Sequence, residues 1–452
     1  MKQMIVNFVA FLFLGSLLFG QDSQLKKTSI TVYNQNIGIV KETRSLNLIK
    51  GTSVTNIVDV AQLIDPTTVK ISFSGEVIEQ NYQYDLVSMD KILLRYLDKE
   101  VQLIGDKGEL IEGTLLSCYG SQVVIKKKEG GLSLLPNIST YRFAVGELPK
   151  GLITRPTLQC MLNAEKGGQQ DIDLSYQTGG MTWHAEYVAV LDKNDKKMDL
   201  NSWVSVVNNC GTAFQDAELK LVAGDVNIVK QKQPNFRETS DMVYMSKGAQ
   251  PQFEEKSFFE YHIYNLQRQT NLSNNETKQV SLFEKEGISV KKKYLFETSQ
   301  YLNNNEKVSV VISFKNEENN NLGVPMPKGK VRIFKSDGKS LEFIGEDEID
   351  HTAKNEELNL HIGNAFDVTA KAIQTDYKKI TDRIFETSYK VTIKNHKSES
   401  ISLEVRHDAG LLWTMKESSI DYKKEDASHI LFVPDIPAGG EKEITFTLRY
   451  QN

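Results

Sequence analysis

The amino-acid sequence predicts a mostly β protein: serial antiparallel β-sandwich domains of the immunoglobulin-like type, with one small SH3-like barrel inserted among them. Apolar and polar residues alternate with a period of two along nearly the whole chain, and Gly, Asn, Asp or Pro interrupts the alternation at short intervals. No segment has a compelling helical pattern longer than about three turns. Short strands joined by tight turns are typical of sandwiches and small barrels.

The first twenty residues differ from the rest and predict a secretory signal peptide. Lys2 provides a positive start, residues 5–19 are almost entirely apolar, and Gly20 precedes a polar stretch that begins at Gln21. The run is too short and too poorly flanked for a stable membrane span, and no cysteine follows it as a lipid attachment point. We therefore expect removal of residues 1–20, no transmembrane span in the mature chain, and an exported protein that is periplasmic or extracellular.

Two domains are predicted in the first third of the mature chain. Residues 21–98 form an N-terminal β-domain, because several alternating segments are followed by one short helical stretch near 90–97. Residues 99–147 contain short alternating segments separated by Gly-containing turns, and this regular spacing predicts a small barrel of the SH3-like or Sm-like type.

The remaining chain is also predicted to be β, with one interruption. The alternation stops where Gln, Pro, Lys, Glu and Ser dominate, which indicates a mobile linker. The predicted units are the first half of a β-sandwich at 148–229, the linker at 230–256, the continuation of the sandwich at 257–321, and a C-terminal β-sandwich at 322–452.

Composition limits the classes of partner and cofactor. The chain has 54 Lys+Arg and 59 Asp+Glu, and this mild acidic excess argues against nucleic acid as the main partner. Among its three cysteines, Cys160 and Cys210 are the better candidates for a disulfide, which leaves Cys118 over. No phosphate-binding glycine loop, His-Glu-x-x-His or Cys-x-x-Cys pattern occurs, so the sequence predicts no cofactor, no metal site and no catalytic set.

The first candidate site lies in the alternating segment around Trp183. On a strand, His184 and Glu186 point to one face together with Thr182, while Trp183 and Tyr187 point to the other. A histidine beside a carboxylate suits acid–base chemistry. The simpler interpretation, which we favour, is a polar strand face behind a buried tryptophan.

The second candidate is an acidic block that contains Asp350 and His351. Together with residues 346–348 it places four carboxylates and one imidazole within six residues, a composition that suits a hard cation or a pair of acids. Three adjacent acids on a strand cannot all point to one face, so a solvated sheet edge is the simpler explanation. Any polar active site in this chain is nevertheless expected here.

Aromatic residues supply the third candidate. Phe258, Phe259, Tyr261 and Tyr264 follow the predicted linker and could form a stacking surface for a glycan or peptide. At this spacing a strand buried on both faces is the favoured interpretation. Phe366 is predicted to belong to the core.

Several sequence blocks, which together cover most of the mature chain, carry a family resemblance. They are GMTWHAEY at 180–187, the segments 203–226, 259–264, 323–327 and 343–347, DHT at 350–352, GNAFDV at 363–368, QTDY at 374–377, and the N-terminal segments 32–34, 40–44 and 64–66. In these blocks the chain resembles an exported bacterial family known as domain of unknown function 4139, some members of which are labelled mucoidy inhibitor A. The resemblance implies a β-sandwich protein outside the cytoplasm and no assigned activity. Mucoidy-inhibitor members place a helical coiled coil where this chain has the predicted barrel, so that label does not transfer.

These observations favour a non-catalytic scaffold or binding module of the cell envelope, with an envelope protein or a glycan as its partner. One alternative is an envelope hydrolase whose site is assembled from dispersed Asp, Glu and His residues, with or without a divalent metal. A second alternative is a carbohydrate-binding protein that uses exposed aromatic residues.

Overall fold

The computed structural model describes residues 23–84, 87–149, 152–224, 226–227, 252–301 and 307–451. It confirms a mostly β fold. The predicted signal peptide and most of the predicted linker lie outside the described residues, but the last four linker positions belong to a strand that begins at Phe253. Among the described residues, no helix is long and apolar enough to cross a membrane.

The N-terminal body packs an eight-stranded sheet, in the order β16-β17-β15-β1-β2-β12-β4 with β18 beside β15, against the three-stranded sheet β3-β11-β5. Its core includes Ile30, Leu46 and Leu162, all almost fully buried. Strands β1 and β15 are parallel, so the sheet is mixed rather than purely antiparallel. The strands are β1 (Gln24–Tyr33), β2 (Gly38–Leu48), β3 (Gly51–Val58), β4 (Ile64–Ser72), β5 (Gly75–Gln83), β11 (Thr157–Ala164), β12 (Gly168–Thr178), β15 (Phe214–Ala223), β16 (Phe253–Phe258), β17 (Tyr261–Leu266) and β18 (Thr270–Leu272).

A small module is inserted between β5 and β11. Its helix begins after Ser88, whose side chain accepts a hydrogen bond from the Lys91 amide. Its five-stranded sheet has the order β10-β6-β7-β8-β9, which returns the last strand beside the first, as in small barrels. No pairing joins β9 to β10 in the described part of the chain, so backbone hydrogen bonds do not close this sheet into a complete barrel. The elements are α1 (Met89–Arg95), β6 (Glu100–Gly105), β7 (Leu110–Tyr119), β8 (Gln122–Lys127), β9 (Leu132–Leu135) and β10 (Tyr141–Ala144).

A five-stranded sheet, β19-β14-β13-β22-β23, forms the middle of the molecule. Strands β13 and β22 run parallel, and Gly329 permits their close approach because a Cβ there would lie 2.0 Å from the Ala185 carbonyl oxygen. The middle core contains Tyr187, Leu200 and Ile333. The strands are β13 (Met181–Leu191), β14 (Lys197–Asn208), β19 (Glu276–Ser289), β22 (Gly329–Ser336) and β23 (Leu341–Ile349).

The C-terminal body contains a ten-stranded sheet that runs β27-β31-β25-β24-β21-β20-β26-β29-β28, with β30 beside β26. The clean alternation of β25 and β31 buries Val391, Ile444 and Phe446 in its core. The elements are β20 (Lys291–Ser299), β21 (Lys307–Lys315), the 3-10 helix η1 (Glu318–Asn320), β24 (Glu357–Lys379), β25 (Ile384–Asn395), β26 (Ile401–Asp408), β27 (Trp413–Ser418), β28 (Tyr422–Lys424), β29 (His429–Phe432), β30 (Asp435–Ile436) and β31 (Glu441–Gln451).

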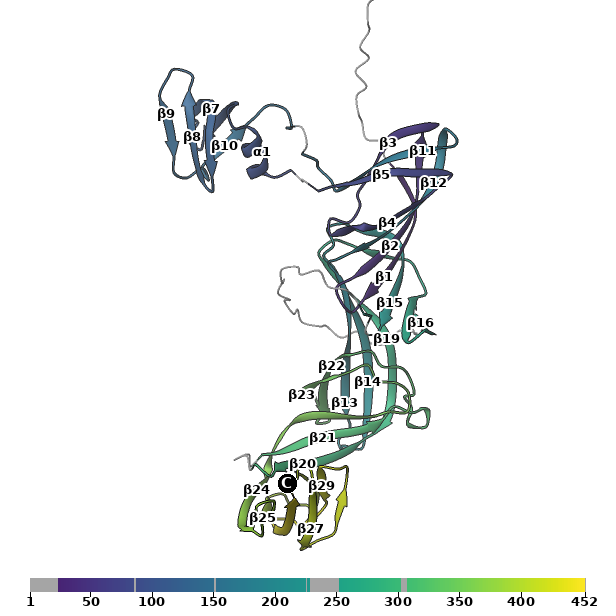
Figure 1. Cartoon of the computed structure of the whole chain (residues 1–452), viewed down its shortest axis with the longest axis vertical. Helices are drawn as coiled ribbons and strands as arrows, with labels where there is room; N and C mark the ends of the chain where they lie inside the picture. The colour runs from purple at the N-terminus through teal and green to yellow at the C-terminus, as the bar shows by residue number, and fades with distance from the viewer. Residues whose placement is uncertain are drawn as a thin grey trace, which may run out of the picture.

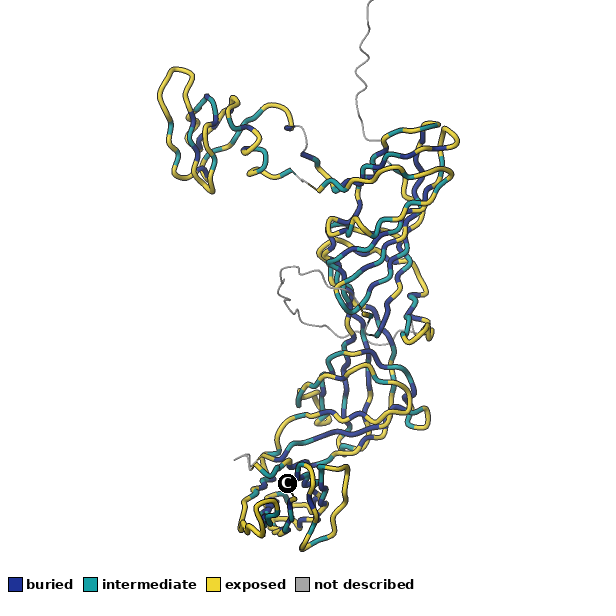
Figure 2. Tube along the Cα trace, in the orientation of Figure 1, coloured by how far each residue is buried: buried dark blue, intermediate teal, exposed yellow. Residues whose placement is uncertain are grey.

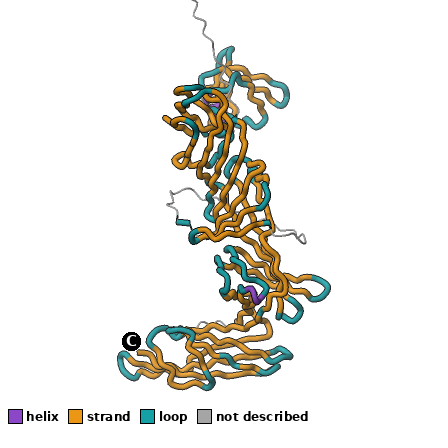
Figure 3. The backbone as a smooth tube through the Cα atoms, turned by 90° about the vertical axis from the view of Figure 1, so that its right-hand side faces the viewer, coloured by secondary structure: helices purple, strands orange, loops and turns teal. Residues whose placement is uncertain are grey.

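Successive cores share strands, and this sharing joins the three bodies into one elongated molecule, which we call the rod (Figure 1). The C-terminal sheet is turned across the long axis at one end of the rod (Figure 3). Strand β13 contributes Trp183 to the N-terminal core and Tyr187 to the middle core. Strand β24 contributes Leu360 to the middle core and Val368 to the C-terminal core. Buried residues accordingly continue along the rod, whereas the inserted module projects sideways with a core of its own (Figure 2).

Candidate functional site

Strand β13 presents the first candidate residues on opposite faces, as the alternation predicts. Trp183 is 1% exposed, its indole Nε1 donates a hydrogen bond to the Val222 carbonyl (3.1 Å), and its ring packs edge-on against Tyr264. His184 lies on the other face and is half-exposed. Trp183 is therefore a core residue, which removes it from the surface available to a ligand.

His184 and Glu186 are in contact, and Arg332 of β22 completes the group. The Nε2 atom of His184 lies 3.2 Å from Glu186 Oε1, and Arg332 Nη1 donates to Glu186 Oε2 at 3.1 Å. The hydrogen bond from His184, together with the Arg332 hydrogen bond and charge, lowers the pKa of Glu186. The carboxylate therefore stays ionised between two donors, an arrangement that ties adjacent strands together.

The acidic block is divided among different partners. Lys330 and Arg332 reach the carboxylate of Glu346 at 3.3 and 3.8 Å, while Asp347 accepts a hydrogen bond from the backbone amide of His361 at 2.7 Å. The facing strands of this hairpin thus pair bases on β22 with acids on β23. The sequence analysis did not identify Lys330 and Arg332, the two basic residues of this site. Their alternation with the apolar Val331 and Ile333, close in sequence to an acidic segment, could have indicated a basic strand face paired with an acidic one.

Asp350 and His351 lie at the end of the same hairpin and do not converge on a common point. Lys328 Nζ lies 3.2 Å from the Asp350 carboxylate, whose side chain is 91% exposed. The Nδ1 atom of His351 accepts a hydrogen bond from the Lys328 amide at 3.1 Å. No group of three or more His, Cys, Asp or Glu side chains within the described ranges could hold a metal ion.

The cysteines are all free thiols in this structure, including the Cys160–Cys210 pair considered for a disulfide. Burial raises the pKa of Cys160 to about 12 and that of Cys210 to about 11. Both thiols therefore stay protonated at neutral pH, and as apolar members of the N-terminal core they lack the thiolate character of a nucleophile.

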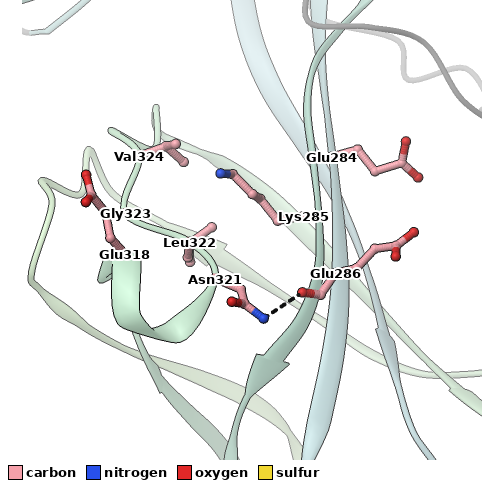
Figure 4. A pocket seen from close by; sticks show the side chains of 8 residues that line it. All are labelled: Glu284, Lys285, Glu286, Glu318, Asn321, Leu322, Gly323 and Val324. Atoms are coloured by element: carbon pink, nitrogen blue, oxygen red, sulfur yellow. Dashed lines mark hydrogen bonds between the residues drawn. The ribbon is translucent and has the colours of Figure 1, made fainter.

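A cleft of about 610 Å³ lies between β19 and the turn that follows η1 (Figure 4). Lys285 points toward this turn, while Glu284 and Glu286 point away from it (Figure 4). Asn321 holds the wall by donating to the Glu286 carbonyl at 3.3 Å, and Gly323 has a φ of +63° where a Cβ would collide with the Glu318 backbone. The cleft is wide and polar, and it presents one ammonium group but no nucleophile beside a base.

The aromatic segment is only partly buried. Tyr264 is 3% exposed, as expected for a core position, but Phe258 is 59% and Phe259 is 83% exposed. The prediction of a fully buried strand is wrong at these two positions because they form the tip of the β16–β17 hairpin, beyond the edge of the core. We call Phe258, Phe259 and Glu260 the hairpin tip.

Phe366 is also misassigned by the sequence, since it is 95% exposed rather than buried. Strand β24 pairs with β21 up to Asn364 and again at Thr369, and the register shift between these two pairs leaves the intervening residues outside the regular ladder. Ala365 packs against the C-terminal core at this irregular point, and Phe366 therefore faces solvent.

A scan against family models matches residues 172–451 to the Domain of unknown function (DUF4139). The chain belongs to this family. The DUF4139 region begins within β12 and ends within β31, so it includes Glu186, Arg332, the cleft beside β19 and the hairpin tip. The inserted module lies outside it. No curated protein matches the chain.

Proposed function

We propose that this protein is an exported, non-catalytic scaffold and binding module of the cell envelope, and that the hairpin tip binds a protein partner. The shared strands of the rod support a spacer role, because they hold binding elements at fixed separations. The apolar segment at residues 5–19 supports export.

The backbone of Phe259 is the observation that carries the binding role. Its φ is +56°, a left-handed conformation that favours glycine and is unusual for a bulky side chain. The ring is 83% exposed and lies 6.2 Å from that of Tyr261. Neither the strained backbone nor the exposed ring benefits the isolated fold, and such strain is concentrated at functional positions.

The shape of the tip favours a protein partner. Phe259 lies in a two-residue turn, and the exposed Phe258 ends the strand just before it, so the two rings are placed as aromatic anchors are when they fill a pocket on another protein. Protein interfaces derive most of their binding energy from a few such residues.

The binding role is tested by photo-crosslinking in intact cells. A benzophenone amino acid replaces exposed Glu260 in the full chain, and the matched control carries it at exposed Lys339, in the β22–β23 turn. We expect one discrete protein adduct at position 260, none at 339, and its loss in Phe259→Gly. An adduct that persists in Phe259→Gly, or that forms equally at both positions, would contradict the proposal.

Export is tested separately, by fractionating the cells and measuring the mass of the chain. We expect a mature protein that begins at Gln21 outside the cytoplasm. Recovery of the intact chain in the cytoplasm would refute the envelope location while leaving the crosslinking result interpretable.

A further inference from the structure

A second cleft is lined by residues of the neighbouring strands β27, β31, β25 and β24 of the C-terminal sheet. Strands β24, β25 and β27 lie in the C-terminal body, away from β16 (Figure 1). Thr447 on β31 lies opposite Ser388 on one side and Glu417 on the other. The Ser388 and Thr447 hydroxyl oxygens are 2.9 Å apart, and Thr375 of β24 extends the line. We call Thr375, Ser388, Thr447 and Glu417 the transverse row.

Register shifts in strands β27 and β24, which lie on the two sides of β31 and β25, account for the concave shape of this surface. Strand β27 shifts register between Met415 and Glu417, and β24 shifts between Gln374 and Asp376, where Thr375 is the extra residue. Bulges bend a strand and redirect its side chains, and they are frequent beside binding and active sites. The resulting cleft has a volume of about 280 Å³.

The cleft is lined almost entirely by groups that form hydrogen bonds. Ser418, Ser419 and Thr445 add hydroxyls to those of the transverse row. Each hydroxyl supplies one donor and two acceptor positions. The carboxylate of Glu417 has no ion-pair or hydrogen-bond partner among the described residues, so its acceptor positions face the cleft unused.

Two ion pairs flank the transverse row on this face. Lys390 pairs with Glu443 at 2.9 Å on one side of the row, and Arg449 pairs with Glu386 at 2.6 Å on the other. The cleft therefore offers hydroxyls and one free carboxylate between two ion pairs.

We propose that the transverse row binds a neutral, polyhydroxylated ligand, a glycan chain that lies across the strands. Vicinal hydroxyls of a sugar can donate to the Glu417 carboxylate while they exchange hydrogen bonds with the Ser and Thr hydroxyls. An anionic ligand is disfavoured by Glu417. An apolar ligand finds no counterpart, because the lining aromatics Tyr389 and Phe446 are each 2% exposed.

The experiment is isothermal titration of the mature chain with four neutral tetrasaccharides: cellotetraose, chitotetraose, maltotetraose and mannotetraose. Tetragalacturonate serves as the anionic comparison. We expect saturable binding of at least one neutral probe and weaker binding of the anionic one. Glu417→Gln and the isosteric Thr447→Val should each weaken binding about tenfold or more, since each removes a hydrogen bond to the ligand.

The matched control is Glu443→Gln, which changes a carboxylate on the same face outside the row and should leave the affinity unchanged. Phe259→Gly should also leave it unchanged, so failure here is distinguishable from failure of the hairpin-tip proposal. The proposal is overturned if no neutral probe binds at millimolar concentration, or if Glu417→Gln and Thr447→Val bind as tightly as the wild type while remaining folded by circular dichroism.

Discussion

The rod and the inserted module are built from similar strands but differ in how their cores are connected. In the rod, β13 and β24 each contribute buried residues to two successive cores. The core of the module, which includes Leu103, Leu115 and Ile125, shares no strand with another core in the described part of the chain.

This difference determines how far a local change is felt. A residue on a shared strand supports two cores, so its loss should reduce the stability of the rod as a unit. A residue in the module should affect only the module, because proteins open in cooperative units that follow their contiguous packing.

The largest effect is expected from Trp183→Ala, which removes a buried ring from a shared strand together with its hydrogen bond to Val222. Truncation of a buried Trp costs about 3–5 kcal/mol. Hydrogen exchange followed by mass spectrometry should show faster exchange in both the N-terminal and middle bodies, with the module unchanged. Leu115→Ala is the matched truncation in the module and should accelerate exchange there alone. Effects of both variants on the same segments would refute the distinction.

A comparable effect is expected from Arg44→Met in the N-terminal body. Arg44 and Glu42 form a buried ion pair at 2.8 Å, and Arg44 also donates to the Val58 carbonyl, at the end of β3. Removing Arg44 leaves Glu42 buried without its counterion, which costs about 3–5 kcal/mol. Urea unfolding should show the loss, and the double variant with Glu42→Leu should recover much of it. A double variant as unstable as Arg44→Met would contradict this assignment.

Low pH should reduce the free energy of unfolding of the rod, because His407 is buried in its C-terminal body. This residue should have no effect on the stability of the module. Burial among Tyr389 and Phe446 lowers the pKa of His407 to about 4. The folded state binds this proton more weakly than the unfolded state, so stability is full above about pH 6.5 and falls as the pH drops toward 4, by about 3 kcal/mol.

Thermal melts between pH 7 and 4 measure this loss, and His407→Phe should flatten the profile of the C-terminal body. Residues 99–147 contain no histidine, so the module supplies an internal reference. An unchanged pH profile in His407→Phe would exclude His407 as the cause.

The smallest effect has the opposite sign. Phe259→Gly should stabilise the N-terminal body by up to about 1 kcal/mol, because glycine adopts the positive φ without strain. Differential scanning calorimetry measures the shift. Tyr119→Gly, at an equally exposed aromatic of the module, is the control and should not stabilise, since Tyr119 is not among the positive-φ residues. A destabilised Phe259→Gly would argue against stored strain at the hairpin tip.

Alternation was sufficient to predict individual strands and, on β13, the opposite faces of Trp183 and His184. It could not predict which strands pair, because pairing depends on residues far apart in the sequence. The sequence alone therefore could not predict the parallel pairing of β13 with β22, which brings Arg332 to Glu186. Phe259 and Phe366 were misassigned for a related reason: turns and register shifts interrupt the period on which burial predictions rest.

The direction of the shared strands has a mechanical consequence. Strands β13, β14 and β19 run along the length of the rod (Figure 1), and they are paired side by side over most of their lengths. Tension along the rod therefore loads their interstrand hydrogen bonds in parallel, as a shear, rather than opening them one at a time. The module, held at one side between β5 and β11, lies off this load path, so a pulled rod would transmit force while the module stays folded.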